Sequence, residues 1–519
     1  MKKLDITGDE EINFKIEKLG KLFPNVVEKV KDEEGSIRQV IDFEKLREEL
    51  GDTVVKSDSK RYLLTWPGRE EALTIANSPA DKMLRPIKED SLNWEATENI
   101  YIEGDNLETL KLLQKSHAGK IKFIYIDPPY NTGKDFIYKD KFILGKEEYA
   151  RKAGKTRGED DTQNADRDGR YHSSWLTMIY PRLKVARGLL KNDGVIFISI
   201  DDKEEYNLRK ICNEIFGEKN FIANFIWRKS KGSGNDSKYV IIETEYILAY
   251  AKNVEDVRFN NKEIDAYDGK FKYKDEHFKE RGGYKLEKLD RGSKGYVESM
   301  DFGIKAPDGT LVFPNGRTKQ SNDGWRWVWS KAKVEWGIKN GYIVVKKGRG
   351  GRWNVYNKVY EKLDNKGNKI TRTKPYKNHI GFEESILNIH ANREMRKLFG
   401  KAVFSFPKPV ALLKYLLKMF YLENEIVLDF FSGSATTAHA VMELNAEDGG
   451  CRKYIMVQLP EPCDEKSEAY KAGYETIAEI GKERIRRAGK KIKEETGADI
   501  DYGFRVYRVD SLNTPRFFL

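Results

Sequence analysis

Short runs of apolar residues alternate with amphipathic stretches in two parts of the chain, residues 96–255 and 396–465. The runs, of which Phe123–Ile126 is an example, are typical of strands buried on both faces. The stretches between them, such as Tyr171–Leu190, repeat apolar residues at helical spacing. This alternation predicts an α/β protein with a doubly wound, largely parallel sheet.

The pattern changes outside these two parts. Residues 1–95 are highly charged and show helical spacing around Val40 and Ile41, which predicts an accessory helical region. Residues 256–395 lose the periodicity, as an inserted module would, and residues 466–519 are typical of a charged helix followed by a strand. A chain of 519 residues is expected to hold two to three modules.

One apolar run ends in Asp127-Pro128-Pro129-Tyr130, where the two prolines stop the strand. In α/β sheets the carboxyl ends of the strands are where ligands bind. There the Asp127 carboxylate and the Pro128 carbonyl could accept the N–H groups of an exocyclic amine while Tyr130 stacks on the base. A base reaches such a pocket only after it is flipped out of its duplex. The alternative is a proline-rich turn with no chemical role.

A second motif runs from Ile426 to Thr437 and predicts a buried strand, a tight turn and a helix. The small residues Ser432, Gly433 and Ser434 let the turn approach a cofactor closely, and the helix start offers free N–H groups. The turn is neither the G-x-G-x-x-G fingerprint nor a phosphate loop, because it lacks the lysine that follows the last glycine there.

Three further acceptors lie where strands are predicted to end. Gln458 and Glu461 compete for the place at which a Rossmann-like unit contacts ribose hydroxyls. Asp105 follows a short strand, where its carboxylate could accept from the amino group of an adenine. It could equally cap the helix that begins near Leu107.

Basic residues gather near aromatic ones, and Lys and Arg outnumber Asp and Glu by 94 to 83, for a net charge of +11. This balance is compatible with a polyanionic partner such as DNA. The insert interleaves tryptophans with basic residues, which suits gripping phosphates and stacking on bases. The alternative for its tryptophans is the buried face of an ordinary strand. The predicted DNA contacts are Arg228, Lys229, Arg326, Trp327, Arg349 and Arg352.

The remaining composition narrows the class of protein. Three cysteines and six histidines show neither a disulfide framework nor metal-ligand spacing, so we expect no metal. No stretch is long enough to span a bilayer, and the first residues lack an apolar signal core. We expect a soluble protein of a reducing compartment.

Together the two motifs resemble the catalytic and cofactor motifs of amino-methylating DNA methyltransferases. Their order, with the catalytic motif first, then the insert, then F-S-F-P-K-P and the cofactor turn, resembles the β group of these enzymes. The stretches I-E-G-D-N-L-E-T-L and I-Y-I-D-P-P-Y-N-T-G-K-D-F are similar to sequences in the modification subunit of type III restriction-modification systems.

The resemblance implies a circularly permuted, Rossmann-like methyltransferase sheet. Residues 96–255 would be its catalytic half and residues 396–465 its S-adenosylmethionine-binding half, with a DNA target-recognition domain at 256–395. Asp127, Pro128 and Tyr130 would hold the base, with Pro129 shaping the turn. The implied cofactor-binding residues are Asp105, Phe406, Lys408, Asp429, Phe431, Ser432, Gly433, Ser434, Gln458 and Glu461.

The implied function is sequence-specific methylation of adenine N6 in double-stranded DNA, by direct displacement without a metal. One alternative moves the target to cytosine N4, and another is a DNA-recognition subunit without catalysis. The implied partners are a separate restriction subunit, with helicase and nuclease parts, and a second copy of the chain. The implied location is the prokaryotic cytoplasm.

Overall fold

The computed structural model describes residues 63–131, 163–232, 239–263, 269–348, 350–382 and 386–511, together with short stretches between 16 and 46. The chain forms two compact units. Unit 1 combines Met1–Phe259 with Lys377–Leu519, and unit 2 is Asn260–Tyr376, which interrupts unit 1 in the sequence.

A ten-stranded sheet organises unit 1, in the order β18-β7-β8-β6-β5-β19-β20-β4-β21-β3. Its strands in chain order are β3 (Lys82–Pro86), β4 (Ile100–Glu103), β5 (Ile121–Ile126), β6 (Leu190–Ile200), β7 (Phe221–Arg228), β8 (Thr244–Ala251), β18 (His379–Ile380), β19 (Ile426–Asp429), β20 (Lys453–Gln458) and β21 (Arg505–Ser511).

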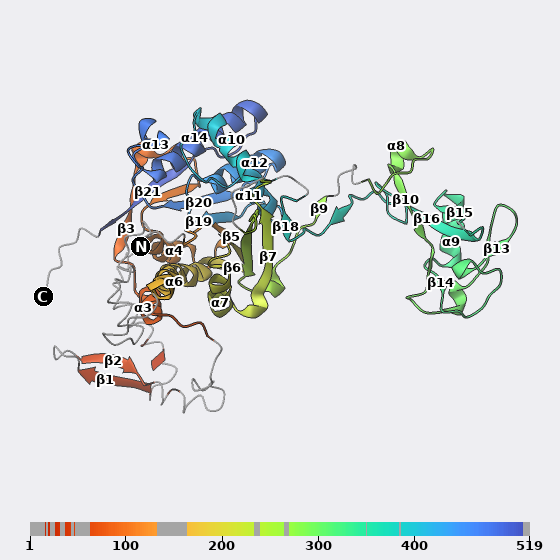
Figure 1. The fold of residues 1–519 in the computed structure, drawn as a ribbon, viewed down its shortest axis with the longest axis horizontal. Coiled ribbons are helices and arrows are strands. Elements are labelled where there is room, and N and C mark those ends of the chain that lie inside the picture. Colours follow the sequence, from red (N-terminus) through yellow and green to blue (C-terminus); the bar gives the residue numbers. More distant parts are fainter. Residues whose placement is uncertain are drawn as a thin grey trace. The chain divides into compact units, whose positions relative to one another are not determined.

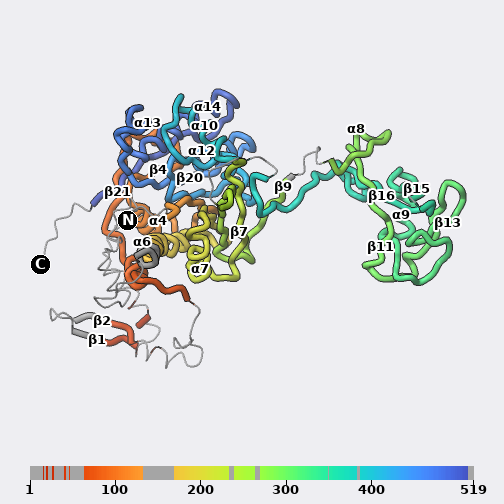
Figure 2. Tube along the Cα trace, in the orientation of Figure 1, coloured from red at the N-terminus to blue at the C-terminus, as the bar shows by residue number. Residues whose placement is uncertain are grey.

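The six strands from β6 to β21 in this order run parallel, whereas β8 is antiparallel to β6 and β3 is antiparallel to β21. Parallel neighbours need crossover connections, and helices supply them here. Figure 2 shows β20, from late in the chain, beside β4, from early in the chain. The predicted doubly wound α/β fold is confirmed.

Helices cover both faces of this sheet, as Figure 1 shows. One face carries α3 (Arg69–Asn77), α4 (Asn106–His117), α6 (Gln163–Leu189) and α7 (Glu205–Phe216). The other carries α10 (Asn388–Phe399), α11 (Val410–Leu417), α12 (Thr436–Asp448) and α14 (Ile477–Thr496), with the short α13 (Glu468–Lys471) preceding α14. The central strand β5 is buried at every position, as expected for a strand covered on both faces.

The segment before residue 95 differs from the prediction. Val27–Lys31 (β1) and Ile37–Ile41 (β2) pair as antiparallel strands, so the predicted helix through Val40 and Ile41 is wrong. Neighbouring β-branched residues fit either period in so short a stretch, and their preference for strands decides the outcome here. This segment also supplies α3 and the edge strand β3.

Unit 2 is built from short antiparallel strands around its own hydrophobic core. A three-stranded sheet has the order β10-β16-β15, and three further pairs are β11-β14, β12-β13 and β17-β9. The elements are β9 (Lys262–Glu263), α8 (Phe278–Arg281), β10 (Tyr284–Lys288), β11 (Asp290–Arg291), β12 (Ile304–Lys305), β13 (Leu311–Val312), β14 (Arg326–Trp327), α9 (Lys331–Lys339), β15 (Ile343–Lys347), β16 (Trp353–Tyr360) and β17 (Thr373–Lys374).

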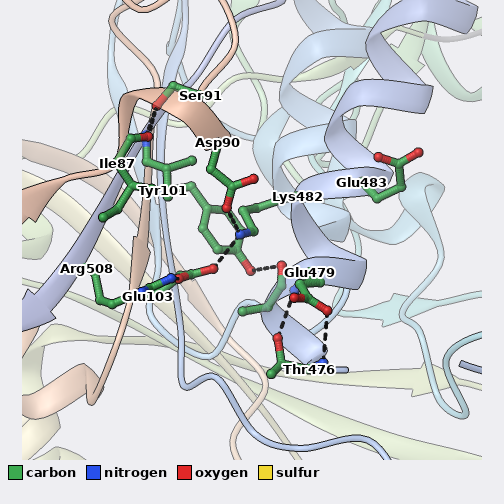
Figure 3. A network of polar contacts seen from close by, with 12 residues as sticks. Ile87, Asp90, Ser91, Tyr101, Glu103, Thr476, Glu479, Lys482, Glu483 and Arg508 are labelled. Carbon is green, nitrogen blue, oxygen red and sulfur yellow. Dashed lines mark hydrogen bonds and ion pairs between the residues drawn. The ribbon is translucent and has the colours of Figure 1, made fainter. Parts of the chain in front are cut away.

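A buried ion network ties α14 to the sheet of unit 1, as Figure 3 shows. The Lys482 ammonium contacts Asp90 and lies 2.5 Å from the Glu103 carboxylate, whose other oxygen is 2.9 Å from Arg508. Arg486 pairs with Asp90 at 3.0 Å. Burial opposes the charge on Asp90, but its bonds to Lys482 and Arg486 hold its pKa below the ordinary value. The network joins β4, β21, α14 and the turn before β4.

We expect Lys482→Met to lower the free energy of unfolding by about 3 kcal/mol, because it leaves the buried Glu103 and the partly exposed Asp90 without their shared cation. Urea unfolding followed by circular dichroism would measure the loss. Lys490→Met is the matched control, since this lysine lies on the same helix with its side chain 79% exposed. Equal stability of the two variants would contradict a stabilising role for the network.

Candidate active site

The sheet places the two predicted motifs side by side. β5 and β19 are parallel neighbours, with Ile124 opposite Leu428, so the Asp127 turn and Asp429 lie at the same edge. From β5 the chain continues to β6 on one side, and from β19 it continues to β20 on the other. This is the point at which the strand order reverses, where α/β sheets form their binding crevice.

The Asp127–Tyr130 turn is fixed by buried side chains beneath it. The indole N–H of Trp175, on α6, donates to the Pro129 carbonyl at 2.7 Å. Asn131, the residue after Tyr130, has a φ of 49° and donates to the carboxylate of the fully buried Glu204. His172 also contacts Glu204, at 2.6 Å. A turn held from both sides presents Asp127 and Tyr130 in one arrangement.

Lys408 reaches into this turn from the segment before α11. Its Nζ lies 2.9 Å from Asp127 Oδ1 and 3.3 Å from Glu245 Oε2, and it donates to the Tyr130 hydroxyl at 2.7 Å. The ammonium also lies over two ring faces, 4.8 Å from the Tyr130 centroid and 5.6 Å from that of Trp227. Predicted as a lining residue of the cofactor pocket, Lys408 contacts the catalytic carboxylate directly.

Glu245 is a site residue that the sequence analysis missed. It accepts from the Tyr130 hydroxyl at 3.2 Å and from Lys229 at 3.1 Å, and only 7% of the residue is exposed. Glu245 lies at the amino end of β8, which pairs antiparallel with β6. That end meets the carboxyl ends of the parallel strands, so an antiparallel assignment for β8 would have pointed to it.

The charged groups in this cluster shift one another's pKa values. Burial raises the pKa of Asp127, and the Lys408 ammonium offsets part of that rise. Glu245 has a lowered pKa, because Lys408 and Lys229 outweigh its burial. Burial disfavours the charge on Lys408, but Asp127 and Glu245 hold its pKa above the ordinary value. Lys408 is therefore a charged ammonium between two carboxylates.

The second motif forms a tight loop around Asp429, a residue only 3% exposed. Its carboxylate accepts from the Phe431 N–H at 3.1 Å and from the Thr437 hydroxyl at 2.6 Å. Burial nevertheless raises the pKa of Asp429 to about 7. Gly433, with a φ of 50°, donates its N–H to the Gln458 side chain at 2.7 Å. A side chain at Gly433 would meet the Phe404 ring at 3.3 Å, so the loop needs glycine there.

The loop is supported from α14 by a buried arginine. Arg484 is fully buried and donates to the Ser434 hydroxyl at 2.9 Å and to the Thr436 hydroxyl at 2.6 Å. Desolvation lowers the pKa of this guanidinium to about 10. With its small side chains, hydroxyls and one acidic group, the loop offers donors and an acceptor for a zwitterionic ligand such as the methionine part of S-adenosylmethionine.

Other predicted cofactor residues have structural partners already. Asp105 caps α4 by accepting from the Glu108 N–H at 3.0 Å, and it pairs with the buried Arg182 at 3.0 Å. The capping role that the sequence left open is thus present. Phe431 is 6% exposed, Glu461 is half-buried, and Phe406 is 85% exposed, so Phe406 lies at the surface. Their contacts with a cofactor remain predictions.

Of the residues predicted to contact DNA, two basic ones pair with carboxylates and one tryptophan is buried. Arg228 pairs with Glu243 at 2.8 Å, and Lys229 pairs with Glu245, so both basic groups face carboxylates. Trp327 is 1% exposed and its N–H donates to the Phe302 carbonyl at 2.7 Å. Its predicted DNA contact is therefore wrong, because the ring is part of the core of unit 2.

Two other basic candidates of unit 2, Arg326 and Arg352, are not in that core. Arg326 is half-buried and Arg352 is exposed. Arg349 lies outside the described residues. Their contacts with DNA remain predictions.

The family model for DNA methylases of the N6/N4 type matches residues 121–487. The chain belongs to this family of DNA methylases. The match spans the Asp127 turn, the Lys408 segment and the Asp429 loop, so it confirms the resemblance from which the site was predicted.

Individual relatives show which members of this DNA methylase family the chain resembles. The chain is 37% identical to the StyLTI Mod subunit, of a type III restriction-modification enzyme from Salmonella typhimurium, over 86% of the chain and 66% of that protein. It is 34% identical to the EcoPI Mod subunit of Escherichia phage P1, over 89% and 73%. It is 31% identical to the type II methyltransferase M.KpnI of Klebsiella pneumoniae, over 75% and 86%. The chain thus spans about two thirds of the StyLTI Mod subunit.

We expect Asp429→Asn to remove a pH dependence of stability. The folded-state pKa near 7 lies above the ordinary value of 3.8, so ionising Asp429 destabilises the fold as the pH rises towards 7. The wild type should lose on the order of 2 kcal/mol more than the variant between about pH 5.5 and about pH 7.

Urea unfolding at a series of pH values would measure this difference. Asp256→Asn, at an exposed position, is the control and should keep the wild-type profile. If the free energy of unfolding changed with pH in the same way for the wild type and Asp429→Asn, burial would not raise the pKa of this carboxyl.

Proposed function

We propose that this protein is a sequence-specific DNA methyltransferase that methylates adenine N6 of a base flipped out of double-stranded DNA. One observation carries the proposal, namely that β5 and β19 bring the Asp127 turn and the Asp429 loop to the same edge of the sheet. Family membership supports the class of reaction, and the site supports the type of nitrogen that is methylated.

The Asp127 turn has the chemistry that an aromatic amine needs. The lone pair of such an amine is delocalised into the ring, which makes its nitrogen a poor nucleophile. The Asp127 carboxylate and the Pro128 carbonyl would accept its two N–H groups and return electron density to the nitrogen. The face of Tyr130 would hold the base, whose entry requires flipping.

The Asp429 loop would hold the cofactor. Asp429, Ser432, Gly433 and Ser434 would surround the methionine part of S-adenosylmethionine, and the Phe431 ring would favour its sulfonium. When bound, this cofactor supplies an electrophilic methyl group. The task of the protein is then to align the amine with that group and to exclude water, because alignment alone is worth several kcal/mol.

An acidic residue at the first position of the motif favours adenine over cytosine N4, which remains the alternative target. A silent recognition subunit is the alternative of another class. The arrangement of Asp127, Tyr130, Glu245 and Lys408 as one partly buried polar cluster favours catalysis, because a surface used only for recognition has no need of it.

Similarity to Mod subunits supports a role as the modification half of a type III restriction-modification system. We propose a separate restriction subunit and a second copy of this chain as partners, in the prokaryotic cytoplasm. Similarity to the type II methyltransferase M.KpnI supports an alternative role, that of a stand-alone methyltransferase. No helix in the described part of the chain is long and apolar enough to cross a membrane.

Unit 2 would bind the DNA backbone through a basic groove of about 590 Å³. Six basic and two acidic side chains line it, and the three exposed basic ones are Lys270, Lys288 and Arg291. Cations arranged in a groove attract phosphates irrespective of sequence. The groove therefore replaces Trp327 in our proposal for how unit 2 contacts DNA.

We expect single-molecule sequencing of DNA from methylation-deficient bacteria that express this chain to show N6-methyladenine at one short site. A mark on one strand of an asymmetric site fits the type III role, whereas marks on both strands of a palindrome fit a stand-alone methyltransferase. Asp127→Ala should give no mark and should bind S-adenosylmethionine as tightly as the wild type does by calorimetry.

Two results would contradict this proposal. Methylcytosine would overturn the adenine assignment, and a full level of methylation by Asp127→Ala would overturn the catalytic role of that residue.

We expect the double variant Lys288→Ala with Arg291→Ala to weaken binding to any duplex and to lower the salt slope of log K by about 2. Fluorescence anisotropy with a labelled duplex at several salt concentrations would measure both. The control is Lys319→Ala with Lys331→Ala, two exposed lysines of unit 2 that do not line the groove. An unchanged salt slope in the groove variant would exclude the groove as the phosphate-binding surface.

A further inference from the structure

Lys408 occupies the place that the target amine needs. Its ammonium forms an ion pair with Asp127 Oδ1 at 2.9 Å and lies over the Tyr130 ring at 4.8 Å from the centroid. A flipped base stacked on Tyr130, with its amine bonded to Asp127, needs the same acceptor and the same ring face. The Asp127 carboxylate has acceptor sites for both groups, so the conflict is one of space: Lys408 Nζ lies beside Oδ1 and over the Tyr130 ring, where the base and its amine would have to lie.

The structure also holds a second carboxylate that can keep the ammonium. Glu245 Oε2 lies 3.3 Å from Lys408 Nζ, while Oε1 is 3.1 Å from Lys229. The two oxygens of Glu245 thus face different lysines. An ammonium that left Asp127 would retain a buried ion pair with Glu245, whereas an unpaired buried charge would cost several kcal/mol.

We propose that Lys408 is a displaceable occupant of the base pocket and that Glu245 is the positioning residue that retains it when the base enters. This inference rests on the proposed methyltransferase function and deepens it. Before DNA binds, Lys408 neutralises Asp127 and fills the pocket. When the amine arrives, the Lys408 bonds to Asp127 and Tyr130 are exchanged for bonds to the amine, and the bond to Glu245 remains.

The exchange explains why two carboxylates and two lysines converge on one turn. The ordinary hydrogen bonds of a neutral amine are weaker than those of an ammonium, so the base alone competes poorly for Asp127. Glu245 lowers the cost of releasing Lys408, because the cation moves from one carboxylate towards another. Lys229 and the Tyr130 hydroxyl hold Glu245 in place for this role.

The test is a double-mutant cycle between Glu245→Gln and Lys408→Met, read by base flipping. The probe is a duplex with adenine at the target position of the methylated site and 2-aminopurine as the adjacent base. The fluorescence of 2-aminopurine rises when its neighbour leaves the stack, and the target adenine keeps the N6 amine that competes with Lys408. Calorimetry with S-adenosylmethionine reports separately whether each variant retains a folded cofactor site. Glu447→Gln is the matched control, because Glu447 pairs with Lys414 and Lys418 and contacts neither Lys408 nor Asp127.

Glu245→Gln is expected to lower the equilibrium for flipping about 10-fold, equivalent to about 1.4 kcal/mol, with cofactor affinity unchanged. Lys408→Met is expected to flip the base at least as well as the wild type, because the pocket then has no competing cation. In the Lys408→Met background, Glu245→Gln should have no further effect, since Glu245 acts through Lys408.

An effect of Glu245→Gln of equal size in both backgrounds would overturn the proposal, because Glu245 would then act on DNA or on the fold directly. Strong loss of flipping in Lys408→Met with normal cofactor binding would overturn it as well. Failure of the proposed function looks different, because the wild type itself would then leave no methyl mark and flip no base.

Discussion

The parallel pairing of β5 with β19 is the constraint on which the site depends. These strands carry the Asp127 turn and the Asp429 loop, and no local interaction joins the two segments in the sequence. Pairing in register aligns their carboxyl ends, and the crossovers to β6 and β20 leave in opposite directions. After a register shift between Ile426 and Val427, Val427 and Leu428 lie opposite Phe123 and Ile124, which brings the two carboxyl ends together.

Around this pair, buried charged groups help to fix the position of the site. Arg484 holds two hydroxyls of the Asp429 loop, Lys482 ties α14 to β4, and Glu204 holds the residue after the Asp127 turn. Charged groups at buried positions are costly unless they are paired, so each pairing has one geometry that satisfies it. The result is a rigid frame behind a crevice whose own charges can exchange partners.

The charge balance in the crevice follows from the same principle. Asp127 and Glu245 would repel each other if both were ionised without a cation, and Lys408 with Lys229 supplies the balance. A nearly neutral cluster lets a neutral base replace one of its bonds without leaving a buried charge unpaired. The Asp127 side chain is 26% exposed, which gives that base a route to the carboxylate.

The sequence by itself determined the α/β class, both motifs and the family, because short apolar runs, prolines and small-residue turns act locally. It could not separate strand from helix at residues 37–41, where neighbouring β-branched residues fit either period. It left Asp105 and the tryptophans of the insert with two roles each. Tertiary structure gave Asp105 a helix cap and an ion pair and placed Trp327 in a core. Only the antiparallel direction of β8 and the segment before α11 brought Glu245 and Lys408 to Asp127, since such contacts depend on distant parts of the chain meeting at one edge of the sheet.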